Sequence, residues 1–235
     1  MAAPSVGIVG AGVAAASCAR ALASVGIRST VYEQGRSAGG PLATRGSRSG
    51  AYKVNHGAPA FTASGPEFRK MIAALEVEGA AQEWTDCTLG VLDGRRRGNR
   101  RGLALVEPAG LRLYRGQPTQ ASLPVHLLEQ AAPHCEPRFG TAIERMAYDG
   151  TERRWRLTPR GGGAEMEHEY LVVSSSLPAN SERWSGLFGV EAPLVSAAAG
   201  SSSPELQAAV AAVGLATSKP VLTRFMQKRR FFNRK

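Results

Sequence analysis

The chain has 235 residues, of which 43% are hydrophobic and 20% charged, and its formal net charge is +10. This length allows one good hydrophobic core or two modest ones, and no apolar window is long enough to predict a transmembrane helix. Ten of the 29 basic residues lie in two runs, 95–101 and 228–235, and the other 19 balance the 19 acidic residues. The body of the protein is therefore neutral, which argues against a basic nucleic-acid-binding face.

Cysteine usage and the N-terminal segment both indicate a reducing compartment. Three scattered cysteines, Cys18, Cys87 and Cys135, fit neither a disulfide framework nor a zinc site, so we expect reduced thiols and no bound metal. Residues 1–19 lack the basic n-region of a signal peptide and are spaced like a strand, a turn and a helix. We expect a cytoplasmic protein, with an organelle as the alternative.

The N-terminal segment predicts a nucleotide-binding unit. Residues 5–9 are apolar and β-branched, which is typical of a buried parallel strand. Gly10 then permits a tight turn, Gly12 lets the backbone approach a pyrophosphate, and the small Ala15 lets the following helix pack closely. That helix ends at Gly26, and its N-terminus offers free amides to phosphate oxygens.

A second predicted strand, residues 27–32, ends beside Glu33, which lies 21 residues beyond Gly12. An acid at this distance binds a ribose 2′-hydroxyl, so a free hydroxyl, as in NAD or FAD, is favoured over NADP. The glycine triplet alone is a weak signal. Strand, turn, helix, strand and acid together predict a Rossmann-like unit.

A second glycine motif, GGPLATR, follows at residues 39–45. Here the chain resembles the FAD-dependent amine-oxidase-like oxidoreductases, and among them the renalase-like branch, in which a motif GG-R-hydrophobic-A/S-T-R follows the ribose acid. FAD extends past the first turn, and a second glycine turn with a nearby cation can approach its ribityl and pyrophosphate groups. The resemblance therefore implies FAD rather than a plain nicotinamide cofactor.

The resemblance continues through most of the chain up to residue 180. Residues 54–63, VNHGAPAFTA, are similar to a family stretch beside the flavin, and residues 121–146 match a return helix and a strand that borders the adenine at Ile143. The strand predicted within 169–178 matches one that returns to the nucleotide domain. The residues expected to bind FAD are Gly10, Gly12, Ala15, Glu33, Gln34, Gly39, Gly40, Leu42, Arg45, Gly57, Ala58 and Ile143.

Two helices are predicted outside this nucleotide unit. An amphipathic helix is expected within residues 66–84, and Ser203 with Pro204 predicts the start of another. The expected buried side of the first consists of Phe68, Ile72, Leu75 and Val77.

The chain departs from the family pattern at several positions. Pro41 stands where the family has arginine, which removes a cation and a backbone donor. Asn55 stands where an acid is usual, and Pro59 and Ala60 replace Gln-Tyr. The sequence also ends before a flavin-contacting segment that lies near the C-terminus of family members, so an incomplete substrate domain is expected.

The predicted fold is α/β, with two domains. A Rossmann-like FAD-binding domain is expected from residues 1–62 and 123–180, and a smaller α+β substrate or lid domain from 63–122 and 181–235. Arginine-rich residues 95–101 are expected to form a loop of the second domain.

The resemblance implies a flavoprotein oxidoreductase. A hydride would pass from a reduced nicotinamide or an amine to the flavin, and oxygen or another acceptor would reoxidise it. The expected partner is this small-molecule substrate, with neither a membrane nor a nucleic acid. No catalytic residue is assigned, because a histidine in a tight turn, such as His56, more often orders its loop. The alternatives are a degenerate flavoprotein that binds FAD weakly, and a basic protein that binds anionic partners or nucleic acid.

Overall fold

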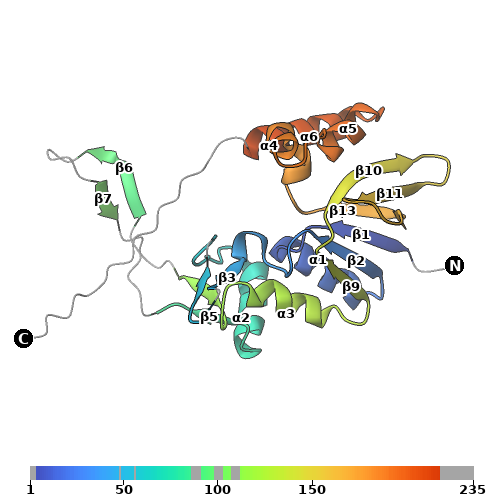
Figure 1. The fold of residues 1–235 in the computed structure, drawn as a ribbon. Coiled ribbons are helices and arrows are strands. Elements are labelled where there is room, and N and C mark those ends of the chain that lie inside the picture. The colour runs from blue at the N-terminus through green and yellow to red at the C-terminus, as the bar shows by residue number, and fades with distance from the viewer. Residues whose placement is uncertain are drawn as a thin grey trace, which may run out of the picture. The chain divides into compact units, whose positions relative to one another are not determined.

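The computed structural model describes residues 4–47, 49–55, 57–85, 91–97, 103–106 and 112–217 (Figure 1). His56, Cys87 and most of the two basic runs lie outside the described residues. The chain divides into two compact units: the first takes its residues from Met1–Ala58 and Thr119–Pro220, and the second from Pro59–Pro118 and Val221–Lys235. Each unit is described by itself below.

A four-stranded parallel sheet forms the centre of the first unit, in the order β13-β1-β2-β9. β1 (Ser5–Val9) pairs with β2 (Arg28–Glu33) on one side and with β13 (Tyr170–Val173) on the other, and β9 (Cys135–Phe139) forms the edge beside β2. β1 is buried along most of its length, as its apolar sequence predicts for a central parallel strand. Parallel pairing brings the carboxyl ends of β1, β2 and β13 to the same edge of the sheet.

Helices α1 (Val13–Ser24) and α3 (Ser122–Gln130) pack against each other and cover one face of this sheet (Figure 1). The inner side of α1 consists of the fully buried alanines Ala15, Ala16 and Ala19. Their small side chains let the helix axis come close to the strands. The local sequence, rich in alanine and leucine, thus serves both helix formation and close packing.

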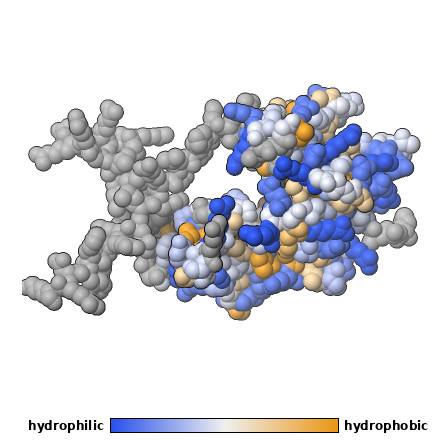
Figure 2. Space-filling model, in the orientation of Figure 1, coloured by the Kyte–Doolittle hydropathy of each residue, from blue (hydrophilic) through white to orange (hydrophobic). Residues whose placement is uncertain are grey.

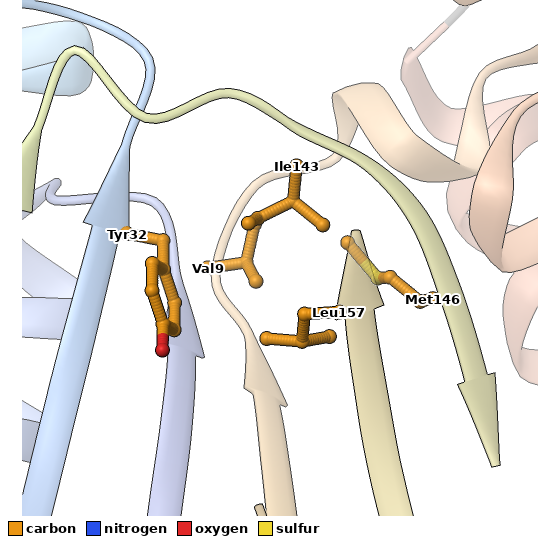
Figure 3. Close-up of a cluster of buried hydrophobic side chains, with 5 residues drawn as sticks. All are labelled: Val9, Tyr32, Ile143, Met146 and Leu157. Atoms are coloured by element: carbon orange, nitrogen blue, oxygen red, sulfur yellow. The ribbon is translucent and has the colours of Figure 1, made fainter. Parts of the chain in front are cut away.

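The opposite face of the parallel sheet is covered by an antiparallel sheet of β10 (Ile143–Asp149), β11 (Arg154–Pro159) and β12 (Met166–His168). Side chains of a strand alternate between its two faces, and Gly7 and Val9 of β1 face this second sheet. Figure 3 shows the core between the sheets, formed by Val9, Tyr32, Ile143, Met146 and Leu157. Burial of each such side chain contributes about 1.5–3 kcal/mol to the free energy of unfolding.

Three helices follow β13 and the short 3₁₀ turn η2 (Leu177–Ala179): α4 (Ser181–Phe188), α5 (Pro193–Ala199) and α6 (Pro204–Thr217). The predicted lid domain began at residue 181, but α5 contacts β10, and its Leu194 packs against the core between the two sheets. These helices therefore belong to the first compact unit. The predicted start of α6 is correct, since the Ser203 hydroxyl accepts a hydrogen bond from the Leu206 amide at 3.2 Å.

The second unit contains α2 (Pro66–Val77), a short sheet of β5 (Ala81–Glu83) and β8 (Tyr114–Gly116), and a hairpin of β6 (Val91–Arg97) and β7 (Leu103–Val106). The helix lies where the amphipathic pattern predicts it, and Ile72 and Leu75 are buried. Phe68 and Val77, also predicted to be buried, are exposed because they lie at the two ends of the helix. Residues 95–97, predicted to form a loop, are the end of strand β6.

The described surface is mostly polar. Figure 2 shows hydrophilic residues over much of the face in view, with hydrophobic residues in small separate areas. The exposed large hydrophobic side chains include Val25, Tyr52, Phe139 and Tyr170, which come from different elements, and such scattered side chains are ordinary on a protein surface. Within the described ranges, every helix is too short or too polar to cross a bilayer.

Candidate nucleotide-binding site

The first glycine turn connects β1 to α1 at the carboxyl edge of the parallel sheet. Gly10 has φ of +98°, which side-chain-bearing residues rarely adopt, and its amide donates to the Tyr32 carbonyl at 2.8 Å. Gly12 precedes α1 in an extended conformation, and a Cβ built on it meets no protein atom within 4 Å. The backbone at Gly12 is therefore open to a ligand, beside the free amides at the start of α1.

The second glycine turn packs directly on the first. The Gly39 amide donates to the Ala11 carbonyl at 2.9 Å, and Gly12 and Gly39 form an isolated parallel β-bridge. A Cβ on Gly40 would lie 3.3 Å from the Gly12 Cα atom, so the two backbones are in close contact. Sequence reasoning placed both turns near a cofactor, but the direct pairing of the turns comes from the structure alone.

Pro41 connects the second turn to residues 57–58. Pro41 lies in the 3₁₀ turn η1 (Gly40–Leu42), and its carbonyl accepts a hydrogen bond from the Ala58 amide at 2.7 Å. A Cβ on Gly57 would overlap the Pro41 carbonyl oxygen, so the chain approaches this closely only with glycine there. Residues 57 and 58, distant in sequence, are thereby held against the second glycine turn.

Glu33 fixes the first turn through both carboxylate oxygens. One oxygen, Oε2, accepts the Ala11 amide at 2.8 Å, and the other, Oε1, accepts the Gly35 amide at 2.7 Å. A carboxylate has about four lone-pair positions, so both oxygens can accept a further hydrogen bond from a ligand hydroxyl. Glu33 therefore shapes the turn in addition to the ribose-binding role predicted from its spacing.

A pocket of about 250 Å³ opens at this edge of the sheet. Six of the predicted cofactor-binding residues line it: Gly10, Gly12, Glu33, Gln34, Gly40 and Ile143. The other six do not line it. Ala15, Gly39 and Leu42 are buried behind the turns, Arg45 is exposed on β3 (Thr44–Gly46), and Gly57 and Ala58 contact the backbone of Pro41.

Part of the pocket lining was not predicted from the sequence. Residues 174–178, SSSLP, follow β13 directly and line the pocket, as do residues 141–142 before β10. Trp184 of α4 is buried and also lines the pocket. The available signal was topological, because ligands of open α/β sheets bind beyond the carboxyl ends of the strands, and residues 174–178 form the C-terminal half of the segment 169–178 predicted as a strand.

The pocket offers mainly neutral hydrogen-bonding groups. Among the described residues that line it, Glu33 is the one with a charged side chain. Pro41 lines the pocket at the position where an arginine was expected by resemblance. Arg45 lies on the exposed strand β3 and is absent from the lining.

A buried polar pair lies between the two sheets, next to the pocket. The Tyr32 hydroxyl is 2.8 Å from Nε2 of His168, and Tyr32 itself lines the pocket. Burial lowers the pKa of His168, and the positive charge of Arg138 lowers it further. Burial likewise raises the pKa of the Tyr32 hydroxyl. Both side chains are therefore kept neutral near pH 7.

Comparison with known proteins identifies the fold around this pocket. The family described as NAD(P)-binding Rossmann-like domain matches residues 8–75 of the chain. The chain contains a Rossmann-like domain. The predicted α/β class, with its parallel sheet and flanking helices, is thereby confirmed, and both glycine turns and Glu33 lie within the matched segment of the Rossmann-like domain.

The solved structures compared below are distant from this chain in sequence. A protein from Exiguobacterium sp. 255-15, provisionally named a protoporphyrinogen oxidase, aligns with a TM-score of 0.56 and 14% identity over 88% of this chain and 64% of its own. BexE, studied for oxidation during BE-7585A biosynthesis, aligns with a TM-score of 0.49 and 22% identity, over 77% of this chain and 32% of its own length. The halogenase PltM aligns with a TM-score of 0.45 and 16% identity, over 73% of this chain and 34% of its own length. This chain thus spans about a third of the last two proteins. At 14% identity, the likeness to the Exiguobacterium protein shows the fold alone.

Proposed function

We propose that this chain is the FAD-binding part of an oxidoreductase. The observation that carries the proposal is the packing of two glycine turns on each other, with Gly12 and Gly40 lining one pocket. One glycine turn at a helix N-terminus suffices for a pyrophosphate. A second turn against the first supports a longer cofactor whose backbone-contacting region extends beyond that group, as in FAD.

The pocket residues suit the nucleotide half of this cofactor. In the proposal the open backbone at Gly12 and the first amides of α1 bind the pyrophosphate, and Glu33 accepts a ribose hydroxyl. Ile143, buried in the core between the two sheets, supplies an apolar contact for the adenine. Four of the six predicted residues outside the pocket lining would border the ribityl and flavin portion: Leu42, Arg45, Gly57 and Ala58.

Bound flavin would supply the redox chemistry, accepting a hydride from a reduced nicotinamide or an amine and passing the electrons to oxygen or another acceptor. The residues of this chain would bind and orient it. The neutral Tyr32–His168 pair adds no charge beside the nucleotide. Renalase-like or amine-oxidase-like specificity is part of the proposal, and no residue is assigned a catalytic role.

One observation favours a second candidate, a flavoprotein that binds FAD weakly and without catalysis. Pro41 supplies no cation, and the described lining of the pocket contains none. A phosphate group loses a charge-assisted hydrogen bond in such a site, and bonds of that kind are about twice as strong as neutral ones.

The absorbance spectrum of the purified full chain tests the proposal. Oxidised flavin bands that remain after gel filtration support tight FAD binding. If added FAD is quenched by the protein but is removed by gel filtration, the weak-binding candidate is supported. A colourless protein that leaves the fluorescence of added FAD unchanged contradicts both. Anaerobic bleaching by NADH or NADPH, compared with bleaching by an amine, then separates the two proposed substrate classes.

A further inference from the structure

We propose that the serine segment after β13, residues 174–176, binds the diphosphate of the nucleotide through hydroxyl groups, in place of a cationic side chain. The inference rests on the proposed function, because it concerns the same pocket. It adds a binding element that neither the glycine turns nor Glu33 supplies.

The serine segment lies directly against the first glycine turn. The Ser174 amide donates to the Val9 carbonyl at 2.9 Å, which extends the pairing of β13 with β1 by one residue. A Cβ built on Gly10 would lie 2.9 Å from the Ser174 Oγ atom and 3.5 Å from the Ser175 Cβ atom. The segment therefore adjoins the turn that approaches a pyrophosphate, and all three serines line the pocket.

The hydroxyl of Ser175 is the best-placed donor. Its oxygen accepts the Leu177 amide at 3.3 Å, and an oxygen that accepts a hydrogen bond keeps its own proton for donation. The Ser174 hydroxyl contacts the Val9 carbonyl at 3.4 Å, a long contact that a phosphate oxygen can replace. Both hydroxyls can therefore donate to an anion without breaking a short hydrogen bond within the protein.

The charge of the lining decides that such donors are needed. Glu33 is the charged side chain among the described lining residues, and both its oxygens are already held by backbone amides. A diphosphate in this pocket meets backbone amides and hydroxyls rather than lysine or arginine. Its binding then depends on short-range hydrogen bonds from uncharged donors, which salt screens far less than long-range attraction between exposed charges.

A ligand series separates the diphosphate from the rest of the nucleotide. Adenosine and ADP are titrated by calorimetry into the full chain and into Ser174→Ala, Ser175→Ala and Ser176→Ala, with the exposed Ser202→Ala as the matched control. We expect Ser175→Ala to weaken ADP binding about tenfold, since it removes one hydrogen bond to a charged group. Adenosine binding should stay unchanged in every variant, and the control should match the wild type for both ligands.

A salt titration tests the same inference without removing a serine. The affinity of the wild-type chain for ADP should change by less than about twofold between low and high NaCl, because the described residues that line the site include no cation. Pro41→Arg adds a cation to the lining, so it should bind ADP more tightly at low salt and lose this gain at high salt.

Each outcome decides the inference. If all three alanine variants bind ADP as tightly as the wild type does, the inference is overturned. It is also overturned if a variant loses as much affinity for adenosine as for ADP, which would indicate a structural role. If the variants fail to fold, a steep salt dependence of the wild type overturns it, and a flat one supports it. If the wild-type chain binds none of FAD, ADP and adenosine, the proposed function and this inference are both rejected. If the chain binds FAD but the serine variants keep the wild-type affinity for ADP, the inference alone is rejected.

Discussion

Two glycines of the site differ in what surrounds them, and this difference separates a role in binding from a role in folding. A Cβ on Gly12 meets no protein atom within 4 Å, whereas a Cβ on Gly57 overlaps the Pro41 carbonyl oxygen. Gly12→Ala should therefore leave the free energy of unfolding within about 0.5 kcal/mol of wild type and weaken nucleotide binding at least about tenfold. Gly57→Ala should destabilise the protein by about 1–3 kcal/mol through overpacking.

Urea unfolding and ADP titration of both variants check this pair of expectations. Gly186, in α4, offers a comparison for folding, since a Cβ there also meets open space, and alanine is the better helix former, so Gly186→Ala should not lower the free energy of unfolding. If Gly12→Ala binds ADP as the wild type does, the pyrophosphate does not approach the first turn.

The buried His168 makes stability depend on pH. Its pKa is lowered in the folded protein by burial and by Arg138, whereas in the unfolded chain it returns to about 6.5. As the pH falls below that value, the unfolded state binds a proton that the folded state does not, so the free energy of unfolding decreases. This contribution is fully present above the unfolded pKa.

His168→Gln provides the comparison, because glutamine can still hydrogen-bond to the Tyr32 hydroxyl and does not titrate. Urea unfolding between pH 8 and pH 5 should show a steeper loss of stability in the wild type than in this variant. Parallel curves for the two proteins would mean that His168 does not carry the pH dependence.

At the scale of elements, the hairpin of β3 and β4 (Lys53–Asn55) supports the start of α3. The Ala121 amide donates to the Thr44 hydroxyl at 3.3 Å, and that hydroxyl donates to Asn55 Oδ1 at 2.7 Å. The same Oδ1 atom accepts the Gln120 amide at 3.3 Å. Two backbone amides just before the helix are thus satisfied by side chains from another part of the chain.

This arrangement gives Asn55, the position where an acid is usual by resemblance, a defined structural role. Asn55→Ala should lower the free energy of unfolding by about 1 kcal/mol. Asn55→Asp keeps the acceptor oxygen and adds a negative charge near the helix N-terminus. Its free energy of unfolding should therefore equal that of the wild type or exceed it by about 0.3–1 kcal/mol at low salt. Urea unfolding at low and high salt measures both, with the neighbouring Lys53→Ala as control. A loss of stability in Asn55→Asp at low salt would contradict this role.

At the scale of the molecule, the whole pocket belongs to the first compact unit. ADP at a hundred times its dissociation constant should stabilise that unit by about 2.7 kcal/mol. Hydrogen exchange should slow most in residues 9–12, 32–35, 39–42 and 174–178, while residues 59–85 of the second unit change little. Protection centred on 59–85 would place the nucleotide elsewhere.

Short-range sequence patterns were enough to predict the local parts of the nucleotide unit. The strand of residues 5–9, the glycine turn, the helix after it and the acid at residue 33 could be predicted because each depends on neighbours within a few residues. The start of α6 at Ser203 and Pro204 was predictable for the same reason. The α/β class followed from the order of these parts.

The contacts between segments that are distant in the sequence come from the tertiary fold. It packs Gly39 on Ala11, holds Gly57 against Pro41, and brings residues 174–178 to the glycine turn. It also assigns residues 181–217 to the first unit, where Leu194 packs against the core between the two sheets. Such contacts depend on strand order and on the burial of apolar surface between elements far apart in the chain, which local sequence patterns do not encode.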